Sequence, residues 1–289
     1  MRLCDWMAWA GTGGGVQEIL RVAAPLLRHN HAVMCLGRVV STAAILALLG
    51  AGTLAGMAST VASLASVVSY PVLLALGLPP VSANVTNTVA LVFTGAGAAA
   101  GSRRELAGQG RLVLRLGALT AAGGAAGAAL LLLTPASAFE AVAPVLIGAA
   151  SLLLIVQPVI SGLAARPGGE RSWRLRAALA GVALYVGYFG AAAGILLLVV
   201  LTAMLDQSLP RINAIKNVVS GMANAAAAVG FALFGPVRWA AVAPLAAGFL
   251  LGGWIGPALV RRLPAQGLRV GIGLGGLILA VRLGLGAYR

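Results

Sequence analysis

The chain has few of the side chains on which catalysis and metal binding usually depend. Its 289 residues include 6 acidic residues, 2 histidines and 2 cysteines. The acidic residues lie near the N-terminus, in loops or at the ends of apolar runs, so a carboxylate proton relay is poorly supported. Without histidines or paired carboxylates inside the apolar runs, a buried hydrolytic site is also disfavoured. We therefore expect no enzymatic activity and no cofactor.

Residues 1–38 differ in composition from everything that follows. Both cysteines and both histidines lie in this segment, at Cys4, Cys35, His29 and His31. Two cysteines support neither a disulfide framework nor a zinc site, so we interpret them as free thiols and predict no metal site. The segment also lacks the basic start, apolar core and cleavage site of a signal peptide. We interpret it as an N-terminal extension that is poorly ordered or interfacial.

The remainder of the chain is strongly apolar. Hydrophobic residues make up 60% of the sequence and charged residues 9%, too little polar surface for a soluble domain. The net charge of +14 would suit nucleic acid, but most cationic side chains lie in or beside short loops between apolar runs. Membrane orientation explains them better, so we expect no nucleic-acid partner. The sequence predicts an all-α polytopic protein of the cell membrane, in particular a bacterial plasma membrane.

Ten apolar runs form two groups of five. The predicted runs are 39–58, 61–77, 82–101, 112–133 and 138–163, then 177–190, 191–205, 212–234, 239–260 and 265–286. A first transmembrane repeat over 39–163, a basic cytoplasmic linker over 164–176 and a second repeat over 177–289 follow from this grouping. In each half, an opening pair precedes three runs long enough to cross a hydrocarbon core of about 30 Å.

Landmarks of the first half recur about 130 residues later. The matches are Pro80 with Pro210, Asn87 with Asn217, glycines 123, 124 and 127 with 252, 253 and 256, and Pro135 with Pro264. If each opening pair returns to the side where it entered, the arginine-rich loops all become cytoplasmic and the halves are inverted. If the pair crosses once, the halves are parallel and Arg261, Arg262 and Arg269 lie outside. We favour inversion, although it places the N-terminal arginines outside.

Glycines interrupt the opening pair of the second half. Gly187, Gly190 and Gly194 divide residues 177–205 into two pieces of about 14 residues, each roughly 21 Å long as a helix. Neither piece spans a bilayer comfortably, so we predict a broken helix or a re-entrant hairpin that faces a protein-lined cavity. The glycine pairs Gly123/Gly127 and Gly252/Gly256 are better interpreted as close-packing surfaces between helices.

Uncharged polar side chains follow both predicted breaks. Asn84, Asn87 and Thr88 share one helical face, and a second stripe contains Asn213, Asn217, Ser220 and Asn224. These amides could bond across helices as structural contacts, or they could face a substrate. Lys216, the only lysine, could attract an anion or extend to the membrane interface. The predicted substrate-binding residues are Ser59, Thr60, Ser63, Asn84, Asn87, Tyr188, Gly190, Gly194, Asn213, Lys216 and Asn217.

The order of these motifs resembles the TauE/SafE family of sulfite and organosulfonate exporters. The resemblance covers roughly 50–285: a glycine-interrupted segment at 187–194, an apolar run, a proline-containing loop, and spans that begin with 83–87 or 214–217. The apolar segment 248–262, which ends in two arginines, is also similar. Alanines at 191–193 make the glycine-rich turn less dense than is typical of the family.

The resemblance implies a secondary transporter that exports small anions, sulfite or organosulfonates, by alternating access around a site near the midplane. In this hypothesis, helix N-termini and Asn, Ser and Thr donors bind the anion. The expected partners are a small anion and the lipid bilayer, and a homo-oligomer remains open. The alternatives are a non-transporting scaffold or accessory subunit, and a transporter of another small metabolite.

Overall fold

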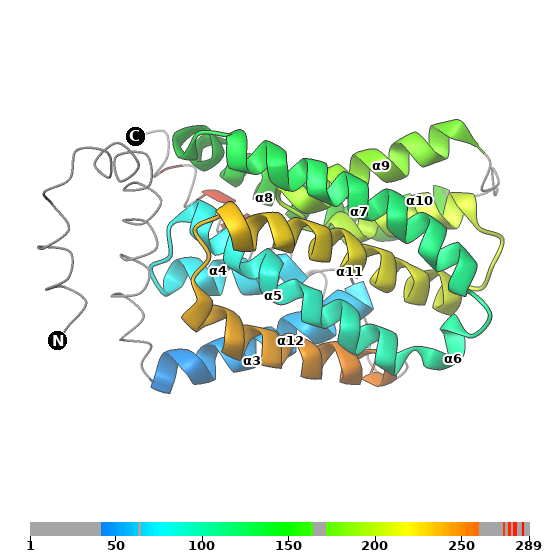
Figure 1. Cartoon of the computed structure of the whole chain (residues 1–289), viewed down its shortest axis with the longest axis horizontal. Helices are drawn as coiled ribbons and strands as arrows, with labels where there is room; N and C mark the ends of the chain where they lie inside the picture. Colours follow the sequence, from blue (N-terminus) through cyan, green and yellow to red (C-terminus); the bar gives the residue numbers. More distant parts are fainter. Residues whose placement is uncertain are drawn as a thin grey trace, which may run out of the picture. The chain divides into compact units, whose positions relative to one another are not determined.

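The computed structural model describes residues 42–62, 65–163 and 172–259, together with positions 274, 277, 278, 280, 281 and 285. All regular structure within these residues is helical (Figure 1). The helices are α3 (Thr42–Ala62), α4 (Ala65–Ala75), α5 (Pro80–Gly101), α6 (Arg103–Leu106), α7 (Gly110–Leu133), α8 (Ala136–Leu163), α9 (Trp173–Tyr188), α10 (Ala193–Met204), α11 (Leu209–Phe234) and α12 (Trp239–Leu259). The prediction of an all-α fold is confirmed.

The predicted apolar runs agree with these helices to within a few residues at most ends. Three boundaries differ by four residues: α3 continues to Ala62, α4 begins at Ala65, and α9 begins at Trp173, inside the predicted linker 164–176. The extension 1–38, Ser63 and most of the run 265–286 lie outside the described residues. Five of the described helices, α3, α7, α8, α11 and α12, are long and apolar enough to cross a membrane.

The helix α5 is long enough to span a bilayer but is less apolar than those five. It has 22 residues, roughly 33 Å of helix, and begins with Pro80, which suits a first helical position because proline lacks an N–H. Its polar residues Asn84, Thr86 and Asn87 are each at most 1% exposed. Their polar groups therefore meet protein rather than lipid, which is how such residues are accommodated in a membrane.

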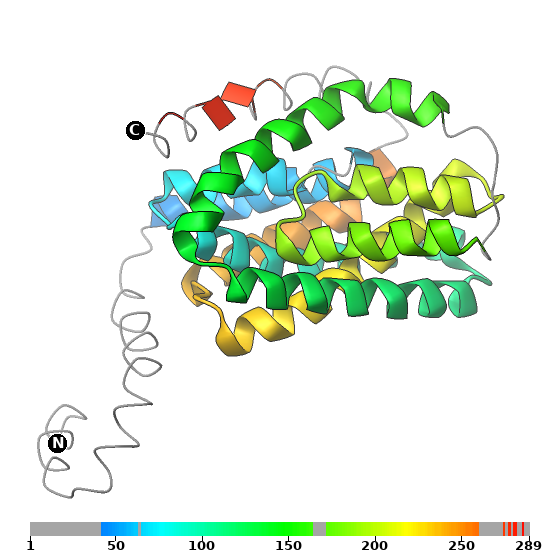
Figure 2. The same ribbon diagram turned by 90° about the horizontal axis from the view of Figure 1, so that it is seen from above.

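The opening pair of the second half is a hairpin. Between α9 and α10 the backbone turns through Gly190 at φ +72° and Ala192 at φ +54°, both in the left-handed region. The Tyr185 hydroxyl donates to the Ala191 carbonyl oxygen at 2.9 Å and fastens the turn. Figure 2 shows α9 and α10 in yellow-green, side by side and joined at one end. The predicted glycine-dependent interruption is therefore present, in its re-entrant form.

This hairpin returns the chain to the end of the bundle at which it entered. The Gln207 amide, just beyond α10, donates to Oε1 of Gln109 at the start of α7, at 3.2 Å. The helix α9 runs alongside α7 in the same direction, because Gly123 faces Ala183 and Gly127 faces Tyr188. The first residues of α9 and the last residues of α10 therefore both lie beside the start of α7.

Glycines allow the two halves to pack closely on each other. A Cβ on Gly127 in α7 would collide with the Leu184 carbonyl of α9, and a Cβ on Gly252 in α12 would collide with the Thr53 carbonyl of α3. Each collision is with main chain, which cannot rotate away. The prediction of close-packing surfaces at Gly123/Gly127 and Gly252/Gly256 is confirmed, and both seams join one half to the other.

The equivalent helices α5 and α11 cross in opposite directions. A methyl group on Gly95 would lie 2.8 Å from the Cα of Gly221, near the middle of both helices. Gly235, at the end of α11, lies beside Val85, near the start of α5. Antiparallel equivalents are what an inverted repeat requires. Inversion of the complete halves stays a prediction, because the last run of the second half is mostly outside the described residues.

Aromatic rings pack around the α9–α10 turn. Phe189 is 3% exposed, and its ring lies edge-on to Tyr70 of α4 with centroids 5.6 Å apart. The ring centroid of Phe139, in α8, lies 5.8 Å from that of Phe189 and 6.0 Å from that of Tyr188. Large buried rings and the hydrogen bonds of the turn together fix its position. The cluster connects the first half to the interrupted segment of the second.

Candidate functional site

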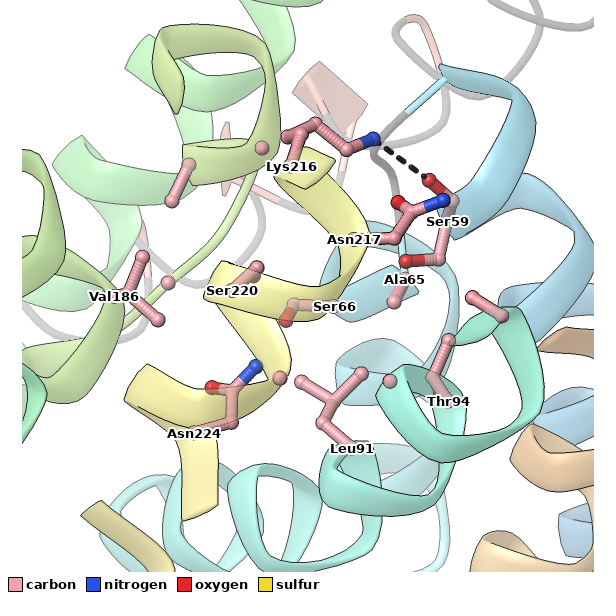
Figure 3. Close-up of a pocket in the computed structure, with 16 residues that line it drawn as sticks. Ser59, Ala65, Ser66, Leu91, Thr94, Val186, Lys216, Asn217, Ser220 and Asn224 are labelled. Carbon is pink, nitrogen blue, oxygen red and sulfur yellow. Dashed lines mark hydrogen bonds between the residues drawn. The ribbon is translucent and has the colours of Figure 1, made fainter. Parts of the chain in front are cut away.

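A cavity of about 50 Å³ lies where the two interrupted helix pairs meet α5 and α11. Figure 3 shows its lining, with Ser59 at the end of α3, Ser66 at the start of α4, and Asn217 and Asn224 along α11. The turn between α9 and α10 contributes Gly190. Both halves of the chain therefore contribute to one cavity, at the place where the interruptions predict a polar site.

Two helices begin at this cavity. Ala65 and Ser66 open α4, Ala193 and Gly194 open α10, and all four residues line the cavity. The N-cap residue of α10 is Ala192, so no side chain bonds to the first N–H groups of that helix. In α10 the Ala193 N–H donates to the Gly190 carbonyl at 3.2 Å and the Ile195 N–H to the Ala192 carbonyl at 2.9 Å. The aligned peptide dipoles give each N-terminus a partial positive charge of about half a unit. The arrangement suits an anion.

Two residues that line the cavity have a buried polar atom without a hydrogen-bond partner among the described residues. They are Thr94 through its hydroxyl and Asn217 through its amide nitrogen, and the side chains are only 5% and 7% exposed. A buried polar group without a partner is unusual in a folded protein, because its desolvation is not compensated. Both groups lie where a bound molecule could bond to them. These two unpaired groups support a binding site independently of the helix N-termini.

Lys216 supplies the cavity with a cationic side chain. It is 2% exposed, and its amine donates to the Ser59 carbonyl oxygen at 3.5 Å, in the last turn of α3. The C-terminal end of a helix carries partial negative charge, which favours a cation there. Because it is buried, Lys216 does not extend to a membrane interface, one of the two roles the sequence allowed. Of the described residues that line the cavity, none is acidic.

Five of the predicted substrate-binding residues line the cavity. They are Ser59, Gly190, Gly194, Lys216 and Asn217. Thr94 was not predicted, although it follows Asn87 by seven residues and therefore shares its helical face. This seven-residue spacing is the signal in the sequence that marks Thr94.

The other predicted residues that the structure describes lie beside the cavity and have protein partners. Asn84 donates from its amide to the Tyr188 carbonyl at 2.9 Å, and Asn213 donates to the Thr60 carbonyl at 3.1 Å. Asn87 donates to the Ser66 hydroxyl at 3.2 Å, and its amide oxygen accepts from Ser69 at 2.6 Å. These hydrogen bonds are of the kind expected if the amides bond across helices as structural contacts. They hold the helix ends that form the cavity wall.

One comparison with known proteins identifies a family. A family model described as sulfite exporter TauE/SafE matches residues 48–283. That range includes every helix from α4 to α12 and most of α3. No curated protein and no solved structure matches the chain.

Proposed function

The chain belongs to the sulfite exporter TauE/SafE family, and we propose that it exports a small sulfur oxyanion by alternating access around the cavity. It is a multi-pass membrane protein of a transporter family. The proposal adds the substrate, sulfite or an organosulfonate, and the bacterial plasma membrane as its location.

The observation that carries the proposal is the meeting of two helix N-termini at one buried cavity. The first residues of α4 and α10 line it together with Lys216 and Asn217, and the described lining contains no carboxylate. Main-chain N–H groups and neutral amides bind an oxyanion without holding it irreversibly, which transport requires. The cavity is formed by both halves, so a movement of one half against the other can change its access.

An anion exporter of this kind needs no proton relay. Moving one negative charge out of a cell with an inside-negative potential releases about 2.3 kcal/mol per 100 mV. The acidic residues Glu105, Glu140 and Asp206 are not among the residues that line the cavity. We therefore expect the rate of export to follow the membrane potential.

Proteoliposomes that contain the full chain test the proposal directly. Vesicles are loaded with sulfite, a potential is imposed, and efflux is measured with the unmodified chain and with Asn217→Ala. We expect potential-dependent efflux, reduced about tenfold or more in the variant, because a hydrogen bond to a charged group contributes about 1.5–3 kcal/mol. Arg211→Gln, an exposed residue of the same helix, serves as the control. Absence of efflux from the unmodified chain would contradict the proposal.

The competing scaffold function has support from the amides that are bonded within the protein. It predicts that water does not reach the cavity. Labelling with a membrane-impermeant thiol reagent separates the two functions: Cys4 and Cys35 are replaced by serine, and Asn217→Cys is introduced. A transporter exposes this thiol from at least one side of the membrane, whereas a sealed scaffold leaves it unlabelled.

A further inference from the structure

We propose that the cavity selects compact, doubly charged oxyanions and rejects sulfonates that carry an ammonium group, an inference that rests on the proposed function. Among the candidate substrates, sulfite and sulfate are compact dianions, and taurine is a zwitterion with a two-carbon chain. The selection follows from three properties of the cavity: its charge, its size and the chemistry of its unpaired donors.

The one charged side chain among the described lining residues, Lys216, is cationic. Lys216 and the N-termini of α4 and α10 contribute positive charge to the cavity wall, and the C-terminal ends of α3 and α9 contribute partial negative charge. No aspartate or glutamate stands among the described lining residues. A dianion matches this wall. The ammonium group of taurine would be buried there without a counter-charge, which is strongly unfavourable.

The cavity is small. Its volume is about 50 Å³, and a water-sized atom occupies roughly 10–15 Å³ of such volume. The cavity therefore has room for about three to five such atoms, a range that includes sulfite with four heavy atoms and sulfate with five. An added carbon chain and amine exceed this volume and would have to extend past the wall. That wall includes main chain of Gly95, Gly190 and Gly221, whose positions are fixed by helix packing.

The polar groups on the wall can each bond to an oxyanion oxygen. Asn217 and Thr94, whose amide nitrogen and hydroxyl are buried and unpaired, are among the residues that line the cavity, and Ser220 and Asn224 lie along the same helix as Asn217. An oxyanion presents acceptor oxygens in every direction. A methyl group in place of one oxygen would leave a donor unpaired, and sites built for hydrogen bonding discriminate strongly against such analogues.

A matched set of ligands tests the inference on the purified full chain. Binding is measured by calorimetry for sulfite, sulfate, methanesulfonate and taurine. Methanesulfonate has nearly the size and shape of sulfate but a single charge, and taurine adds chain and amine. We expect sulfite and sulfate to bind, methanesulfonate to bind at least about tenfold more weakly, and taurine to show no binding.

The Lys216→Gln variant identifies the origin of the charge preference. We expect its ratio of sulfate to methanesulfonate affinity to fall several-fold toward one, whereas Arg211→Gln keeps the ratio of the unmodified chain. If the Lys216 variant does not fold, the ligand series on the unmodified chain still decides. Equal affinity for sulfate and methanesulfonate, or measurable binding of taurine, would overturn the inference.

The two proposals fail in different ways. Efflux of sulfite together with taurine at similar rates would leave the exporter function in place and overturn the selectivity. Binding of sulfate and sulfite with no efflux of any sulfur oxyanion under a potential would overturn transport and support the binding preference. Absence of binding by all four ligands would overturn the selectivity.

Discussion

Asn84 and Asn213 make the same hydrogen bond in opposite halves of the protein. Each is the fifth residue of its helix, α5 or α11, and each donates its amide to a carbonyl in the last turn of the other half's opening helix. The acceptors are Tyr188 at 2.9 Å and Thr60 at 3.1 Å. A helix end leaves such carbonyls without an intrahelical partner. The two amides therefore hold the helix ends that approach the cavity.

Removing either amide should destabilise the protein by a similar amount. We expect Asn84→Ala and Asn213→Ala each to lower the free energy of unfolding by about 1 kcal/mol, the usual contribution of a hydrogen bond between membrane helices. Unfolding of the full chain in detergent measures both. Thr134→Val is the control, because its hydroxyl bonds to Leu130 in its own helix turn and is exposed. A large loss of stability in one variant and none in the other would show that the two hydrogen bonds match in geometry but not in energy.

The sequence predicts the interruptions well because their cause is local. Gly190 adopts a positive φ that glycine favours, and the pieces on either side are too short to span a membrane, so the break could be placed from residues alone. The hydrogen-bond partners of the Asn84 and Asn213 amides could not be predicted in this way. Their acceptors are main-chain carbonyls, which every residue has, so no residue type in the sequence marks Tyr188 or Thr60 as a partner.

The offset between the halves illustrates the same limit. The sequence match pairs Asn87 with Asn217 at a spacing of 130. In the structure, α5 begins at Pro80 and α11 at Leu209, and the matching hydrogen bonds pair Asn84 with Asn213, a spacing of 129. Side chains one residue apart point about 100° apart on a helix, so the difference decides which amide faces which partner.

Thr94→Val should separate binding from stability. Valine has nearly the shape of threonine, and the Thr94 hydroxyl has no partner among the described residues. Removing an unpaired buried hydroxyl leaves the free energy of unfolding unchanged or raises it by about 1 kcal/mol. If the hydroxyl serves the anion, affinity for sulfite falls several-fold in the same variant. A clear loss of stability would instead mean that Thr94 bonds within the fold.

The seam between α3 and α12 should tolerate no added methyl group. A Cβ on Gly56 would lie 2.8 Å from the Phe249 carbonyl oxygen and 3.0 Å from the Cα of Gly252, both main chain. We expect Gly56→Ala to destabilise by about 1–3 kcal/mol, the typical effect of overpacking. Gly50→Ala, in the same helix, meets nothing within 4 Å and should be close to neutral. Equal melting temperatures for the two variants in detergent would contradict this packing.

The α9–α10 turn offers a matched pair of alanines. Ala192 has φ +54°, where a side chain is disfavoured, and Ala193 begins α10. In Ala192→Gly the relief of strain, about 1 kcal/mol, offsets the loss of a buried methyl group, so stability should hardly change. Ala193→Gly loses its buried methyl without such relief and should destabilise by about 1 kcal/mol. Chemical denaturation of both variants measures the difference.

The crossing of α5 and α11 has a mechanical consequence. Because Gly95 and Gly221 have no side chains, the main chains of α5 and α11 meet directly, and no side chains lie between the two helices at this point. One helix can tilt against the other about this contact. The final residue of α11, Phe234, lies roughly 20 Å along the helix from Gly221, so a tilt of about 10° would carry that tip about 3.5 Å sideways. A small change in the angle between the helices at the two glycines therefore becomes a larger displacement at the ends of α5 and α11.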